Sequence, residues 1–183
     1  MWWLLMVCLS LQSSSSLASP LTVCEVLQDL KASQGKSIAV LGRWSGSPEG
    51  EGESLSEVDC ARPVKTKGFT WPNALSLEWD PHSPLELDVS AMNQEAVAAK
   101  LQAVKRTTKL RAGERWAVVY GRLETRKLKV TQSRDRKTVS HGFGHLAVFP
   151  AAIFYGGKSV HFLPSPDAPE DNSPRIPRSP PAQ

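Results

Sequence analysis

Beyond its first twenty residues, the chain has no apolar run long enough to cross a membrane. A membrane-spanning helix needs about 20 apolar residues, and the N-terminal run over residues 2–11 is far shorter. The sequence also contains no G-x-S-x-G, P-loop or Rossmann glycine pattern. Its Ser, His and Asp residues show no spacing that marks a catalytic triad, and no cofactor motif is present. These absences favour a binding or interaction module over an enzyme.

The short apolar run at the N-terminus has the features of a secretory signal. Residues 2–11 form an h-region of suitable length, and Ser16 and Ala18 place small side chains at the two positions that a cleavage site after Ala18 requires. The usual basic residue before the h-region is missing. The pattern nevertheless predicts a signal peptide over residues 1–18, and therefore a secreted or periplasmic protein of the cell envelope.

Cysteine is scarce, and Cys8 lies inside the predicted signal. The remaining pair, Cys24 and Cys60, would meet an oxidising compartment after export, where an even number of cysteines favours a disulfide bond. Two free buried thiols are the alternative. A metal pair is less well supported, because no His or further Cys lies at close ligand spacing to either residue.

Two periodicities divide the rest of the chain into helices and strands. Thr22 and Glu25 form a capping box at the start of a short amphipathic helix. Residues 37–44 alternate with apolar side chains on both faces, which predicts a central strand, and Gly42 marks a bend or a close backbone approach. Further elements are expected as strands within residues 47–59, 75–79, 115–125 and 145–155, as a hairpin return arm at 128–130, and as a helix over residues 91–108.

The order of these elements predicts the fold. One helix, three strands, a second helix and two or three more strands match the OB fold, in which a helix joins the third and fourth strands of a five-stranded barrel. We therefore predict a mixed, OB-like β-barrel with helices over residues 21–163 and a disordered, Pro-rich tail over residues 164–183. Pro150 predicts that the last strand lies at an edge or a bulge. An open α+β sheet is the alternative fold.

Several segments resemble a group of small exported bacterial proteins of uncharacterised function that are thought to be OB-like. The resemblance extends over residues 23–155 and implies the barrel, the disulfide and export, but no activity and no site residues. The segments that carry it are V-C-E-V-L (23–27), G-K-S-I-A-V-L-G-R-W (35–44), D-C (59–60), W-P-N-A (71–74) and G-H-L-A-V-F-P-A (144–151).

Basic residues are concentrated in one part of the chain. Residues 100–137 hold 13 Lys or Arg against three acidic residues. A basic OB-like barrel with exposed aromatic rings can bind single-stranded nucleic acid, but export favours an anionic glycan, a membrane surface or an acidic protein patch instead. A solvated helix face and hairpin is the plainest alternative. The candidate binding residues are Trp44, Trp71, Arg122, Arg126, Lys127 and Lys129.

Two histidines form the only arrangement that suggests a metal. His141 and His145 have the H-x-x-x-H spacing that binds zinc on a helix, but Gly142 and Gly144 argue against a helix here. We therefore predict no metal, no cofactor and no catalytic residue. Two alternative functions remain open, a metal-dependent or hydrolytic envelope enzyme that uses His141 and His145, and a structural cell-envelope protein.

Overall fold

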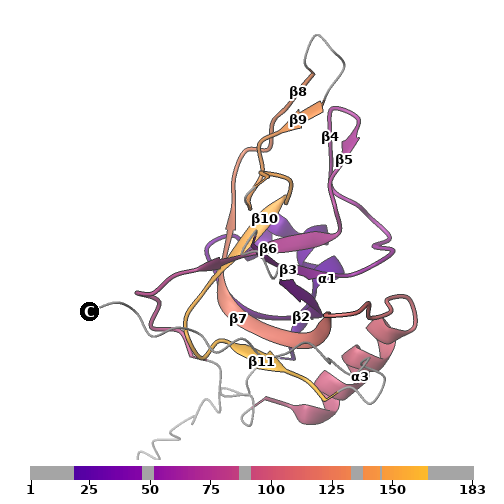
Figure 1. The fold of residues 1–183 in the computed structure, drawn as a ribbon, viewed down its shortest axis with the longest axis vertical. Coiled ribbons are helices and arrows are strands. Elements are labelled where there is room, and N and C mark those ends of the chain that lie inside the picture. Colours follow the sequence, from indigo (N-terminus) through magenta and orange to yellow (C-terminus); the bar gives the residue numbers. More distant parts are fainter. Residues whose placement is uncertain (1–18, 47–51, 87–91, 133–137, 145, 165–183) are drawn as a thin grey trace, which may run out of the picture.

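The computed structural model describes residues 19–46, 52–86, 92–132, 138–144 and 146–164 (Figure 1). The predicted signal, nearly all of the predicted tail, and His145 lie outside these residues. The elements are β1 (Leu21–Thr22), α1 (Val23–Gln28), α2 (Leu30–Ser33), β2 (Ser37–Gly46), β3 (Glu53–Ser56), β4 (Lys65–Thr66), β5 (Phe69–Thr70), β6 (Ala74–Trp79), α3 (Gln94–Lys105), β7 (Arg115–Thr125), β8 (Val130–Gln132), β9 (Thr138–Ser140), β10 (Ala151–Tyr155) and β11 (Val160–Phe162).

Five of these strands form a closed barrel. Antiparallel pairs join β2 to β3, β3 to β6 and β7 to β10, and a parallel pair joins β6 to β10. The ring is closed by β2 and β7, which pair from Ser37 opposite Arg122 to Trp44 opposite Arg115. The third and fourth barrel strands are joined through α3. The predicted OB-like barrel is therefore confirmed, and the open sheet is wrong because β2 and β7 leave no free edge between them.

The interior of the barrel is apolar, and the buried side chains of α1 pack against it. The inward face of β2 carries Val40 and Gly42, as its alternation predicted, and the buried residues of α1 belong to the same apolar cluster as Val40 and Leu55. The side chain of Val23 approaches Gly42 and Leu55 from the interior side. We infer that α1 covers one end of the barrel. A helix this short is stable only when it is docked on the rest of the protein.

A disulfide bond fastens α1 in this position. Cys24 in α1 and Cys60, which follows β3, are bonded, with their Cα atoms 5.2 Å apart. Next to this bond, the carboxylate of Glu57 accepts a hydrogen bond of 2.9 Å from the Cys24 amide. The capping box of Thr22 and Glu25 is present. The predicted disulfide is thus confirmed as a link between the N-terminal helix and the barrel.

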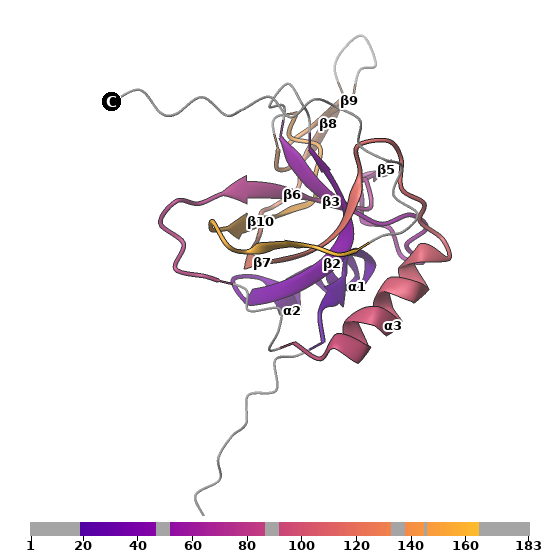
Figure 2. The same cartoon turned by 60° about the horizontal axis from the view of Figure 1, so that its bottom comes forward.

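The long helix α3 packs on the outside of the barrel (Figure 2). Val97 and Val104 of α3 are buried against Leu41 of β2 and Val118 of β7, which lie on the outward faces of those strands. The predicted helix begins at Gln94 after its cap, Asn93, and ends at Lys105. None of the described helices is long and apolar enough to cross a membrane.

Two predictions about the last strands are wrong. β10 is hydrogen-bonded on both sides, to β6 and to β7, and is therefore not an edge strand. Pro150 precedes the first residue of β10, so its missing N–H leaves the ladder complete. Residues 128–130 do not return along β7, because Val130 opens β8, which pairs with β9 in a separate hairpin.

We predict that the close contact at Gly42 makes G42A destabilising. A Cβ there would lie 2.8 Å from Cγ of Leu55 and 2.9 Å from Cγ2 of Val23, so the interior must shift. Overpacking of this kind costs about 1–3 kcal/mol, which urea unfolding of the oxidised protein would measure. G157A is the matched control, because its Cβ would meet only the Trp79 ring, at 3.4 Å. Equal free energies of unfolding for the two variants would contradict close packing at Gly42.

Candidate anion-binding surface

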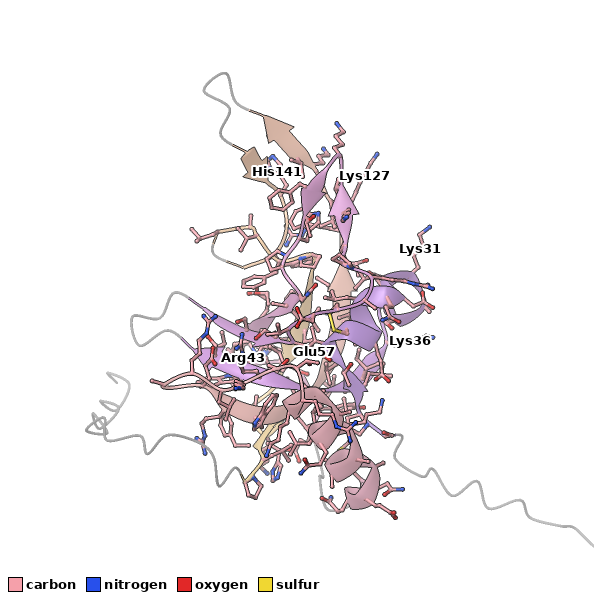
Figure 3. All side chains as sticks on the ribbon, turned by 90° about the vertical axis from the view of Figure 1, so that its right-hand side faces the viewer. Lys31, Lys36, Arg43, Glu57, Lys127 and His141 are labelled. Carbon is pink, nitrogen blue, oxygen red and sulfur yellow. A yellow bond between two sulfur atoms is a disulfide. The ribbon has the colours of Figure 1, made fainter. Side chains whose placement is uncertain are left out.

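Two short hairpins project from the same end of the barrel. One is formed by β4 and β5, within the connection from β3 to β6, and the other by β8 and β9, within the connection from β7 to β10. Figures 1 and 3 show both hairpins side by side, away from α3. Connections of this kind can carry function while the barrel stays rigid.

Trp71 joins the bases of the two hairpins. Its backbone amide donates to the Val64 carbonyl at 2.9 Å, and its Nε1 donates to Oγ1 of Thr66 at 3.0 Å. Its ring meets Phe69 edge to face, with 5.1 Å between centroids. On the other side the ring packs so closely on Gly142, after β9, that a Cβ there would lie 2.8 Å from Cζ3. Trp71 is only 1% exposed, so it supports the hairpins from beneath.

Arg126 is held in place at the base of the second hairpin. Its guanidinium carbon lies 3.7 Å from the centre of the Phe143 ring, which is a cation–π contact. Phe143 is itself buried and bridged to Phe149. The amide of His141 donates to the Lys129 carbonyl at 3.0 Å. The backbone that carries the basic side chains is therefore ordered by contacts of its own.

The two hairpins and their bases present five cationic side chains to solvent. All five are exposed, and none forms an ion pair with another described residue. The nearby carboxylate of Glu78 is occupied, because it accepts hydrogen bonds from the Ser76 hydroxyl and the Gly144 amide. Unpaired charges of one sign raise the local positive potential. We call this set the basic hairpin surface: Lys65, Lys67, Arg126, Lys127 and Lys129.

The structure brings together only some of the residues that the sequence suggested. Arg126, Lys127 and Lys129 share the basic hairpin surface, and Trp71 lies buried below it rather than exposed. Trp44 is half-buried at the Arg115 end of the β2–β7 pair, whereas Arg122 lies at the other end of that pair.

Arg122 and Trp44 each have separate surroundings. Arg122 forms an ion pair of 3.0 Å with Glu124 and lines a cavity of about 290 Å³ together with Phe154. The Trp44 ring packs against Phe162 at 5.2 Å. The six predicted residues therefore do not form one groove.

Sequence reasoning missed Lys65 and Lys67. The periodicities predict no element between residues 59 and 75, although Lys67 and Gly68 both have positive φ, of 47° and 82°, and form the turn between β4 and β5. The short K-T-K-G-F-T segment contains this signal, because a Gly between two short alternating runs favours a hairpin. Strands of two residues, however, are too brief for periodicity to detect.

The described part of the chain shows no metal centre. It contains no group of three or more His, Cys, Asp or Glu side chains placed to hold an ion. His141 is exposed, and its predicted partner His145 lies outside the described residues. The structure therefore does not test a site formed by these two histidines.

No protein-family model, no curated protein and no solved structure matches the chain. The resemblance of residues 23–155 to small exported bacterial proteins therefore stays a prediction.

We predict that W71F loosens both hairpins and leaves the barrel intact. The variant loses the hydrogen bond to Thr66 and part of the ring that packs on Gly142. Amide exchange of residue 71 and of His141, which bond to Val64 and Lys129, should speed up about tenfold, since local opening costs less. W79F is the control, because Trp79 is 57% exposed. Faster exchange in the first hairpin alone would show that Trp71 does not support the second.

Proposed function

We propose that this protein is an exported, disulfide-stabilised, OB-like module that binds an anionic glycan through the basic hairpin surface. The observation that carries the proposal is the set of five exposed, unpaired cations on two hairpins that share one buried support, Trp71. Binding requires no catalytic group. It requires a stable scaffold, here the closed barrel, and exposed connections that carry the binding residues, here the two hairpins.

The hairpins suit an extended polymer better than a compact ligand. Their cations come from two separate connections of the barrel, and none of the five lines the cavity beside Arg122. Repeated sulfate or carboxylate groups can contact several such cations at once, and many weak contacts then add. Arg126 is already ordered by its contact with Phe143, which reduces the entropy lost on binding.

A membrane surface is less well supported as the partner. Peripheral membrane binding usually combines basic residues with an apolar face that enters the bilayer. Among the described residues, the large hydrophobic side chains with high exposure are Trp79 and Leu146, at 57% and 71%. Of these, only Leu146 belongs to the connection that carries β8 and β9. A single exposed leucine offers little area for insertion, so electrostatic contact with a hydrated polymer is the better match.

Export is supported by two separate features. The N-terminal pattern predicts a signal, and the Cys24–Cys60 bond is compatible with an oxidising compartment. The anionic polymers available outside the cytosol are chiefly glycans rather than nucleic acid. The proposed location and the proposed ligand therefore agree.

We predict that expression in an exporting bacterial host yields a chain that begins at Ser19. The intact mass under non-reducing conditions should equal that of residues 19–183 less the hydrogens lost in forming one disulfide. A18Q places a large side chain at position −1 and should block cleavage at this site. Recovery of a chain that starts at Met1, or of free thiols at Cys24 and Cys60, would exclude the proposed export.

We predict that K127Q/K129Q and K65Q/K67Q each weaken binding to the sulfated glycan heparin by about tenfold. Each exposed contact to an anion contributes modestly, and two together approach one decade in Kd. Added salt should weaken wild-type binding more than variant binding, because fewer charges remain to be screened. The measurement is calorimetric titration in a salt series, with uncharged dextran as a ligand that should not bind.

The control K31Q/K36Q removes the same charge from a different part of the molecule. Both lysines are exposed, and Figure 3 shows them apart from Lys127. Its Kd for heparin should stay within about twofold of the wild type. If the control loses as much affinity as the hairpin variants, binding follows net charge and the surface has no special role. If anionic vesicles bind and heparin does not, the glycan proposal fails.

A further inference from the structure

A second candidate site lies between the end of α3 and β7. A cavity of about 330 Å³ is lined by Lys105, Thr108, Lys109, Leu110 and Trp116. Cavities of this size accommodate small organic molecules. Figure 1 shows α3 at the opposite end of the molecule from the two hairpins, so this cavity is separate from the basic hairpin surface.

Trp116, which lines the cavity, carries an indole N–H with no hydrogen-bond partner among the described residues. Trp116 is only 2% exposed, and its Nε1–H donates no hydrogen bond to any described residue. A buried donor left unsatisfied costs about 1–3 kcal/mol, so such groups usually have a partner. The Thr108 hydroxyl, also buried, accepts a hydrogen bond of 2.9 Å from the Val58 amide and keeps its own proton available. Both residues line the cavity, and each carries a polar hydrogen that no described residue accepts.

The charges around the cavity are positive. The ammonium groups of Lys105 and Lys109 form no ion pair within the described part of the chain. The neighbouring acid, Glu114, is occupied by the Arg43 guanidinium at 3.4 Å and by the Arg111 amide at 2.6 Å. The lining therefore offers four donor groups, namely two ammonium groups, one hydroxyl and one indole N–H, and, among the described lining residues, no carboxylate.

The remaining lining is apolar. Trp116 and Leu110 belong to the cluster that packs α3 on the barrel. The backbone of Lys109 is fixed by a hydrogen bond of 3.0 Å from the Arg43 guanidinium to its carbonyl. A ligand that satisfies this lining carries one anionic group for the donors and an apolar body for the indole and leucine surfaces.

We propose that this cavity binds a small organic carboxylate with an apolar body. The carboxylate lies between the ammonium groups of Lys105 and Lys109 and accepts from Nε1 of Trp116, while the apolar body covers Leu110. Trp116 and Thr108 are buried and Lys105 is half-buried, so hydrogen bonds from these groups meet less competition from water than those on the exposed hairpin surface.

Octanoate is a suitable probe, because it combines one carboxylate with a short alkyl chain. Titration of the disulfide-bonded protein should give a saturable shift of the Trp116 indole N–H resonance, assigned through bonds and by its loss in W116F. Octylammonium and octanol should give no saturable shift, since neither supplies an anion. An equal response to octylammonium, or no saturable response to octanoate, would overturn the proposal.

Variants separate this site from the hairpins. K105Q/K109Q should weaken octanoate binding about tenfold and leave heparin binding within about twofold, and K127Q/K129Q should do the reverse. W116F keeps the buried ring but removes the donor, and it should weaken octanoate severalfold while the chain stays folded. If K105Q/K109Q binds octanoate as well as the wild type, the lysines do not form the site and the proposal is wrong.

Discussion

The Cys24–Cys60 bond is the constraint on which the barrel interior depends. The helix it holds, α1, has six residues, too few to be stable in water by itself, yet its buried side chains complete the apolar interior. The bond closes a loop of 36 residues, for which the chain-entropy model gives about 3–4 kcal/mol. That is a large share of the 5–15 kcal/mol by which typical domains are stable. Reduction would therefore remove a large share of the stability that keeps the helix docked on the interior.

The closed barrel is held together by its own strand pairs, so its two hairpins contribute little to the fold. β2 pairs with β1, β3 and β7, and the absence of a Cβ at Gly42 lets α1 approach the strand from inside. The interior is filled and α3 covers part of the outer face, and no residue of the two hairpins belongs to either apolar cluster. Trp71 then supports both hairpins locally, at the end where the cations gather. The fold thus separates the part that provides stability from the part that we propose binds.

The sequence predicted those features that depend on local chemistry or strong alternation. The capping box at Thr22, the two apolar faces of β2 and the order of elements led to the barrel, because each is fixed by neighbours in the chain. Pro150 led to the wrong prediction of an edge strand, because the sequence does not show whether a proline lies within a strand or directly before its first residue. Burial of Trp71 depends on Gly142, some seventy residues away. Such long-range packing leaves no periodic signal.

The two proposed sites use the same charge under different physical conditions. On the hairpins the cations are exposed, so each contact is weak and screened by salt, and affinity requires many contacts along a polymer. At the α3 cavity two lysines act beside a buried indole, where less water competes and a single carboxylate can satisfy several donors. A basic sequence segment does not distinguish these cases. The difference arises because Lys105 is half-buried beside the packed interface of α3 with β7 and Lys109, although exposed, lines the same cavity, whereas Lys127 and Lys129 are exposed and line neither cavity.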